Sequence, residues 1–197
     1  MILTVASFKG GVSKTTTAVH LAAYLAERAP TLLVDGDPNR STLGWSRRGA
    51  LPFQVVDERQ AAKFVRAAEH VVIDTAARPS RDDLEALAGG CDVLVIPTTP
   101  DALGLEALLA TVEALKGIGA DRYRVFLAIV PPKPSRDGEE ARSMLVDAGL
   151  PLLAGQVRRA AAFQKAALAG VVVRDLKDPR AAECWNDYQT IGRELAP

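Results

Sequence analysis

The sequence is poor in cysteine and has no excess of charge of either sign. Its two cysteines, Cys91 and Cys184, form no CxxC pair and have no histidine at ligand spacing. Isolated cysteines of this kind argue against a zinc or iron–sulfur site, and we expect them to be reduced core side chains. The 24 basic and 24 acidic residues balance. Binding to nucleic acid or to an anionic membrane therefore requires a local patch.

Long apolar segments are also absent. No stretch approaches the roughly 18 apolar residues that a membrane span requires, and the first residues read as a strand and a loop, not as a cleavable leader. We therefore expect a cytoplasmic protein. The 197 residues favour a single domain over residues 1–197, because no linker, low-complexity tract or repeat divides the chain.

Short apolar, β-branched runs alternate with segments of helical period. The predicted strands span 2–6, 31–34, 70–73, 93–97 and 125–130, with a weaker edge strand over 53–56. The predicted helices span 16–29, 58–67, 84–88, 103–115, 139–148, 160–169 and 179–195. Continuous apolar strands separated by helices are typical of a parallel sheet covered on both faces. We predict an α/β doubly wound domain with a mostly parallel sheet flanked by helices.

The first predicted strand runs into a glycine-bearing loop that opens a helix. The loop consists of Lys9, Gly10, Gly11, Val12, Ser13, Lys14, Thr15 and Thr16. A strand, turn and helix in this order direct backbone N–H groups and the positive end of the helix dipole at one spot, which suits a polyphosphate. Lys14 is then placed to reach the β- and γ-phosphates, and the Thr15 hydroxyl is placed to bind Mg²⁺. The alternative is a Gly-Gly turn between two surface lysines.

This loop departs from the GxxxxGK[ST] signature, because Phe8 and Ser13 occupy its two glycine positions. A second lysine, Lys9, lies five residues before Lys14 and gives KGGxxK, which resembles the deviant Walker A motif of the ParA/MinD family. The resemblance implies a P-loop ATPase that forms a homodimer with ATP, in which Lys9 crosses the interface and touches the partner subunit's phosphates. The family usually has glycine at the place of Ser13, where a Cβ can cost on the order of 1 kcal/mol in strain. We expect ATP to bind nonetheless.

Acidic residues follow two of the predicted strands: Asp35 and Asp37 after one, and Asp74 after the other. Hydrolysis of a γ-phosphate needs a metal and a positioned water, and ligands of open α/β sheets bind at the carboxyl ends of strands. We predict that Asp74 is the Walker B carboxylate and that Asp37 orients the attacking water. The DxDP arrangement resembles the family's switch I region, which implies that Asp35 helps to organise the metal shell. Alternatively, these carboxylates only cap helices or turns.

Two further regions are assigned by the resemblance. In the family the adenine base rests against loops after the later strands, and here Pro131 and Pro132 follow the strand at 125–130. They either pack on the ring or only stiffen the surface. Because this loop has no asparagine, the preference for ATP over GTP depends on the resemblance alone.

The C-terminal third also resembles small ParA-type partition ATPases, so the resemblance spans nearly the whole chain. In those proteins basic residues around this segment bind DNA without sequence preference, which makes Arg158, Arg159 and Lys165 the candidates here. An ordinary solvated helix start explains them as well. No helix-turn-helix segment precedes Met1, so we do not expect operator reading. The last helix lacks the basic face of a membrane anchor, so we do not expect membrane binding.

The resemblance therefore predicts a ParA-type ATPase that uses ATP and Mg²⁺. Its ATP-bound dimer would hold nucleoid DNA, and a ParB-like or cargo-adaptor protein would stimulate slow hydrolysis. Repeated cycles would position a plasmid, a chromosome locus or a protein cargo. One alternative is a metabolic or metal-delivery P-loop ATPase, although the isolated cysteines weigh against metal delivery. Another is a nucleotide-binding scaffold whose hydrolysis is impaired by Ser13.

Overall fold

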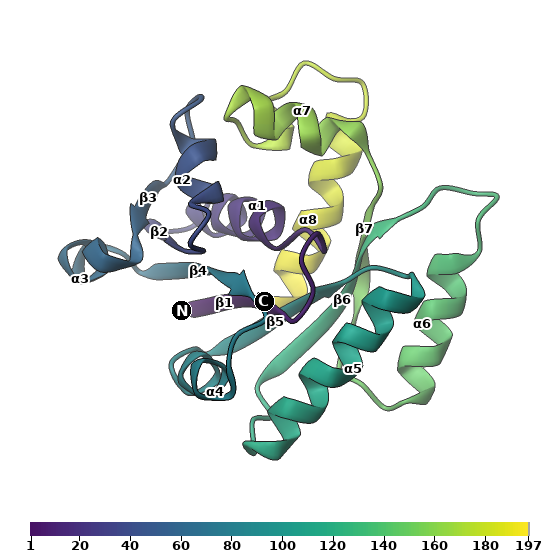
Figure 1. Cartoon of the computed structure of the whole chain (residues 1–197). Helices are drawn as coiled ribbons and strands as arrows, with labels where there is room; N and C mark the ends of the chain where they lie inside the picture. Colours follow the sequence, from purple (N-terminus) through teal and green to yellow (C-terminus); the bar gives the residue numbers. More distant parts are fainter. Residues whose placement is uncertain (197) are drawn as a thin grey trace.

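The computed structural model describes residues 1–196, and in this part of the chain seven strands form one sheet (Figure 1). The strands are β1 (Ile2–Ser7), β2 (Thr31–Gly36), β3 (Gln54–Asp57), β4 (His70–Ala77), β5 (Val93–Thr98), β6 (Tyr123–Val130) and β7 (Leu152–Arg158). Their order is β3-β2-β4-β1-β5-β6-β7, and every neighbouring pair is parallel. All carboxyl ends therefore lie at one edge of the sheet, where ligands of such sheets bind.

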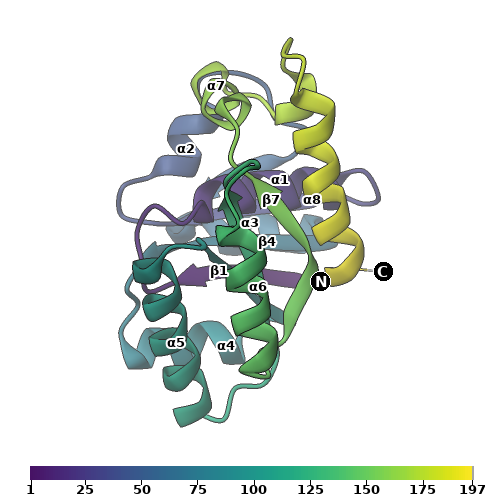
Figure 2. The ribbon, with the colours of Figure 1, turned by 90° about the vertical axis from the view of Figure 1, so that its right-hand side faces the viewer.

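Helices cover both faces of this sheet (Figures 1 and 2). The α-helices are α1 (Lys14–Ala26), α2 (Ser41–Ser46), α3 (Ala61–Phe64), α4 (Arg81–Gly89), α5 (Ala102–Gly117), α6 (Asp137–Asp147), α7 (Ala161–Ala169) and α8 (Ala181–Leu195). Short 3₁₀ turns are η1 (Glu58–Gln60), η2 (Val65–Ala67) and η3 (Val173–Asp175). One apolar core packs α1, α7 and α8 on the sheet, and a second packs α4, α5 and α6 on the other face. The predicted doubly wound α/β fold is confirmed.

Residues 58–67 do not form the continuous helix that their sequence predicts. The segment divides into η1, α3 and η2, and the φ angles of Gln60 and Phe64 at the two junctions are −106° and −110°. None of the three turns has a buried residue. A helix this short depends on tertiary packing, and this segment is mostly exposed, with Ala61 and Phe64 partly buried against a small apolar cluster beside β2 and β3. The prediction of one helix here is wrong.

Two elements are not predicted by the sequence patterns, namely α2 and β7. In β7, buried and exposed residues alternate, as in a strand with one covered face. A Cβ on Gly155 would lie 2.9 Å from Ile191 Cδ1 of α8. Gly155 therefore allows α8 to pack closely on the strand. The same glycine hides the strand in the sequence, because a glycine inside an apolar run normally argues against a strand.

Helix α1 is fixed to the C-terminal segment through His20, which is fully buried. Its Nδ1 lies 2.7 Å from the Thr16 carbonyl oxygen, and its Nε2 accepts a hydrogen bond from the Val173 backbone N–H at 3.1 Å. Burial lowers the pKa of His20 to about 4. The imidazole is therefore neutral at pH 7, and the helix that begins at the loop is held rigidly against η3.

The cysteines agree with their predicted role, because Cys91 and Cys184 are both buried and free. Within residues 1–196, no helix combines the length and the apolar character needed to cross a bilayer.

Candidate nucleotide-binding site

The loop between β1 and α1 turns through two residues in the left-handed region. Gly11 has a φ of +79°, and Ser13, the N-cap of α1, has a φ of +70°. The first backbone N–H groups of a helix have no partner within the helix, so those of α1 face the loop together with the positive end of the helix dipole. This is the geometry of an anion site at the end of the first strand.

Lys14 is a nearly buried cation in this loop, with 8% of its surface exposed. Within residues 1–196, the one hydrogen bond from its Nζ is long, 3.5 Å to the Lys9 carbonyl oxygen. Burial lowers the pKa of Lys14, and the negative charges of Asp74 and Asp37 oppose that shift. The structure thus brings together the predicted lysine and two of the predicted carboxylates. An anion bound in the loop would give the Lys14 ammonium a direct partner of opposite charge.

Asp74 and Asp35 lie opposite each other on neighbouring strands β4 and β2, and both are fully buried. Asp74 Oδ2 accepts a hydrogen bond from the Thr42 hydroxyl at 2.7 Å, whereas its Oδ1 has no partner among the described residues. Burial raises the pKa of Asp74 to about 6, against the lowering effect of the Thr42 and Thr15 hydroxyls. A carboxylate oxygen that is buried without a partner marks a place for a cation or a water.

The residues present fit Mg²⁺ bound together with a nucleotide. Mg²⁺ is usually held by one or two carboxylates and by substrate phosphates, with water in the remaining positions. Thr15 and the unpartnered Oδ1 of Asp74 offer that limited set of oxygens. Within residues 1–196, no group of three or more His, Cys, Asp or Glu side chains forms a site in which protein ligands alone would hold a metal.

Asp35 contacts backbone through both carboxylate oxygens. Its Oδ1 accepts from the Asp37 N–H at 3.1 Å, and its Oδ2 accepts from the Leu43 N–H at 2.9 Å. Asp35 therefore shapes the segment between β2 and α2. A part in the metal shell stays a prediction, and the geometry supports the capping alternative for this residue.

Asp37 is half-buried at the start of the same segment, and its Oδ1 accepts from both the backbone N–H and the Nδ2 of Asn39, each at 2.9 Å. Within residues 1–196, Oδ2 of Asp37 accepts no hydrogen bond. A part in orienting a water stays a prediction. Asn39 and Thr42 are site residues that the sequence analysis did not name. The only available signal was their position just after the DxDP motif.

Lys9 forms an ion pair within its own chain. Its Nζ lies 2.8 Å from Asp101 Oδ1, and Asp101 also caps α5 by accepting from the Gly104 N–H at 2.9 Å. The hydrogen bonds from Lys9 and from the Thr99 hydroxyl lower the pKa of Asp101 to about 2. Crossing to a partner subunit stays a prediction, and it would require Lys9 to leave Asp101.

A cavity of about 900 Å³ lies beside the loop. Its lining includes Gly11 and Ser13 from the loop, Pro132 after β6, and Phe163 and Tyr188 from α7 and α8. Its size suits a nucleoside, and an apolar lining with a few polar groups is typical of such sites. Pro132 lines this cavity, and Pro131 lines a smaller neighbouring hollow. Contact of either proline with a base stays a prediction.

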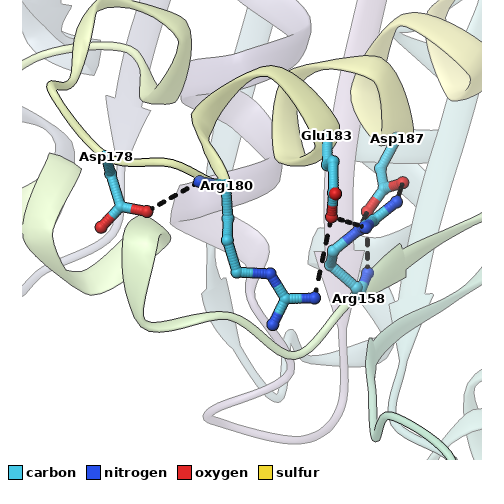
Figure 3. Close-up of polar contacts among 5 residues, drawn as sticks. All are labelled: Arg158, Asp178, Arg180, Glu183 and Asp187. Atoms are coloured by element: carbon cyan, nitrogen blue, oxygen red, sulfur yellow. Dashed lines mark hydrogen bonds and ion pairs between the residues drawn. The ribbon is translucent and has the colours of Figure 1, made fainter.

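The three predicted DNA-binding residues differ in their surroundings. Arg158 holds Asp187 through two hydrogen bonds, Nε to Oδ2 at 2.7 Å and Nη2 to Oδ1 at 2.8 Å, and it also pairs with Glu183 (Figure 3). Lys165 pairs with Asp178 at 2.7 Å. Arg159 is exposed and has no carboxylate partner within the described part of the chain.

The Arg158 guanidinium therefore fastens β7 to α8 and is not free for phosphate. The two acidic residues are one turn apart on α8, so they face the same side of that helix. Of the three predicted residues, Arg159 best fits a contact with DNA. DNA binding itself stays a prediction.

Replacing Ser13 with glycine should raise the melting temperature by about 2–4 °C, because a side chain in the left-handed region costs about 1 kcal/mol. The contacts of the Ser13 hydroxyl oppose the gain: it lies 3.5 Å from Thr17 Oγ1 and also interacts with the Tyr188 hydroxyl. Thermal unfolding monitored by circular dichroism would measure the change. The control Gly11→Ala should lower the melting temperature, because Gly11 has a φ of +79°. A less stable Ser13→Gly protein would show that the contacts of the Ser13 hydroxyl outweigh the strain.

A parallel sheet whose first strand enters a two-lysine loop, next to buried carboxylates on the neighbouring strands, defines a P-loop nucleotide-binding domain. The sequence profile of the CobQ/CobB/MinD/ParA nucleotide binding domain matches residues 3–173. The chain belongs to this family. The resemblance to the ParA/MinD family that its loop suggested is confirmed.

Among similar proteins, "Maintenance of carboxysome distribution protein A" of Gloeobacter kilaueensis is 35% identical over 201 residues, which cover 98% of this chain and 93% of that protein. The solved structure of apo McdA from Cyanothece has a TM-score of 0.78 at 18% identity, covering 100% of this chain and 99% of that one. The septum site-determining protein MinD of Pyrococcus horikoshii, solved with Mg-ADP, has a TM-score of 0.71 at 17% identity and covers 99% and 95%. These structures confirm the fold.

Proposed function

We propose that this protein is a ParA-type ATPase that binds ATP with Mg²⁺, dimerises around it, and positions a cargo on DNA. The observation that carries the proposal is the buried Lys14 ammonium beside the fully buried Asp74 at the mouth of the loop. Lys14 and Asp74 are both shielded from water, yet they form no ion pair with each other. A phosphate bound to Lys14 and a metal bound to Asp74 would connect the two side chains. The match with MinD bound to Mg-ADP supports this nucleotide and this metal.

The chain's own residues divide the work as follows. The α1 amides and Lys14 hold the phosphates, while Thr15 and Asp74 face the metal. When bound, Mg²⁺ neutralises charge that develops on the transferred phosphoryl group. Asp37, fixed on one oxygen by Asn39, uses the other oxygen to orient the attacking water. The pocket bounded by Pro132 receives the base.

The proposed dimerisation depends on Lys9. Of the two lysines in the loop, Lys14 lies beside Asp74, whereas Lys9 points elsewhere and pairs with Asp101. Its side chain is 27% exposed, so a second subunit can reach it. In a sandwich dimer the triphosphate of the partner subunit competes with Asp101 for this amino group, and a triphosphate carries more charge than one carboxylate. Bound ATP therefore stabilises the dimer.

The dimer contacts DNA through Arg159, the predicted basic residue that has no carboxylate partner within residues 1–196. A twofold axis presents this residue twice, and contacts with phosphate carry no sequence preference. A cargo-adaptor or ParB-like protein stimulates hydrolysis and releases the dimer from the nucleoid. The relative from Gloeobacter kilaueensis is named for carboxysome distribution, which supports a large protein assembly as the cargo, in place of a plasmid or a chromosome locus.

The proposal is tested by size-exclusion chromatography with light scattering and by DNA binding, both with a non-hydrolysable ATP analogue and Mg²⁺. The protein should elute as a monomer without nucleotide and as a dimer with it. Only the dimer should bind unrelated duplexes, with an affinity that falls as salt rises. A monomer under all conditions would contradict the proposal.

Arg159→Glu should weaken DNA binding about uniformly across sequences and reduce its salt dependence. Because Arg159 also lines the cavity proposed for the nucleoside, ATP affinity and dimerisation are measured on the same variant, and the DNA effect is compared at saturating nucleotide. The matched control is Arg66→Glu, which makes the same charge change at an exposed residue of η2, beyond the other edge of the sheet. Equal losses for the two variants would indicate a general effect of charge and not a contact by Arg159.

A further inference from the structure

Thr42 stands out among the polar residues around the site, because it is fully buried and donates to a fully buried carboxylate. Its hydroxyl lies 2.7 Å from Asp74 Oδ2. A buried hydroxyl of this kind is expected to have a hydrogen-bond partner, and here the partner is the predicted Walker B residue. The other carboxylate oxygen, Oδ1, has no partner among the described residues. The two oxygens of Asp74 are therefore not equivalent.

We propose that Thr42 is a positioning residue that fixes Asp74 Oδ2 and so keeps Oδ1 directed to the nucleotide-bound metal. This inference rests on the function proposed above. A carboxylate that can rotate presents either oxygen to a cation, whereas a hydrogen bond to one oxygen selects the other. Partners of metal-binding carboxylates act in this way by orienting the ligand and by favouring its charged form.

Thr42 can hold Asp74 because its own helix is held. The neighbouring Leu43 N–H donates to Asp35 Oδ2 at 2.9 Å, which fixes the first turn of α2 to β2. Arg40, just before the helix, donates to the Asp35 carbonyl oxygen at 2.9 Å and pairs with Asp57 of β3 at 3.2 Å. These contacts connect α2 to two strands, so the hydroxyl is presented from a rigid base.

The position of Thr42 also connects the two predicted parts of the hydrolysis machinery. Thr42 and Asp37 lie on one segment, five residues apart, between β2 and the first turn of α2. Asp37 faces the attacking water and Thr42 holds the metal-facing carboxylate. A shift of this segment therefore moves both groups together.

Thr42→Val tests the inference, because it removes the hydroxyl and keeps the shape. The affinity for fluorescent ATP is measured over a range of Mg²⁺ concentrations and in EDTA. The variant should need about 10- to 100-fold more Mg²⁺ for half of the metal-dependent gain in affinity. Its affinity for ATP in EDTA should stay close to that of the wild type, because the Thr42 hydroxyl is engaged with Asp74 and acts through the metal. Thr42→Ser keeps the hydroxyl and should restore the Mg²⁺ dependence.

Ser41→Ala is the matched control, since it removes an exposed hydroxyl from the same turn and should change nothing. If Thr42→Val fails to fold, as judged by thermal unfolding, Thr42→Ala provides the same test without the added methyl group. A wild-type Mg²⁺ dependence in the folded variant would overturn the inference while leaving the proposed function intact. Equal losses in Thr42→Val and Thr42→Ser would also overturn it, because they would assign the effect to packing. A wild-type protein that shows no saturable ATP binding with Mg²⁺ would overturn both.

Discussion

Lys9→Ala should bind ATP as a monomer nearly as well as the wild type, yet fail to form the ATP-dependent dimer. In the proposed dimer each of the two lysines donates a charge-assisted hydrogen bond to a phosphate of the other subunit. Two such bonds, at about 1.5–3 kcal/mol each, correspond to a dimer that is weaker by about 100- to 10,000-fold. Light scattering over a concentration series with a non-hydrolysable ATP analogue would measure this loss.

Two control variants separate the role of Lys9 from a change in net charge. Lys63→Ala removes an exposed lysine from α3 and should leave the dimer unchanged. Asp101→Asn removes the charge that pairs with Lys9 but keeps an oxygen that can cap α5. It should therefore not weaken the dimer. A Lys9→Ala protein that still dimerises with ATP would show that Lys9 serves only its ion pair with Asp101.

Asp37→Ala should have the opposite result, with an ATP-bound dimer that accumulates and stays on DNA. Under the proposed function the substitution removes the group that orients the attacking water, so turnover should fall by about 100- to 10,000-fold. Lys14 and Asp74 are untouched, so nucleotide binding should persist. Phosphate release and size-exclusion chromatography with ATP and Mg²⁺ would follow the two effects.

Asp147→Ala provides the control for that experiment, because Asp147 is an exposed aspartate at the end of α6, on the other face of the sheet. It should hydrolyse ATP at the wild-type rate. Unchanged turnover in Asp37→Ala would remove Asp37 from the mechanism and leave it as a turn residue that holds Asn39. Release of the dimer from DNA at the normal rate would have the same meaning.

The phosphate loop could be found from the sequence because its information is local. Lys14 follows β1 and opens α1 within a few residues, so the pattern of apolar residues around the motif places the lysine correctly. The same holds for Asp35 and Asp74, whose strands were predicted and turned out to be neighbours in register. Parallel strands bring such residues together whatever the details of the loops.

The contacts that the sequence did not reveal join residues far apart in the chain. Lys9 and Asp101 are separated by 92 positions, and Arg158 and Asp187 by 29. When its partner is distant in the sequence, a charged residue is predicted to be solvated, and for this reason Arg158 was predicted to be available for DNA. Thr42 was missed because α2 is short and carries no strong helical period, which left its residues without a predicted direction.

The ion pair between Lys9 and Asp101 has a consequence for a solitary molecule. The Lys9 amino group, which the proposed dimer requires, is already paired with a carboxylate, so an unrelated anion gains little by binding there. Under the proposed function, dimer formation is an exchange of partners: Lys9 leaves Asp101 only if the second subunit presents an anion that binds Lys9 more strongly. A nucleoside diphosphate carries less negative charge, so Lys9 returns to Asp101 and the subunits separate. The number of phosphates on the nucleotide then decides whether the protein is a monomer or a dimer.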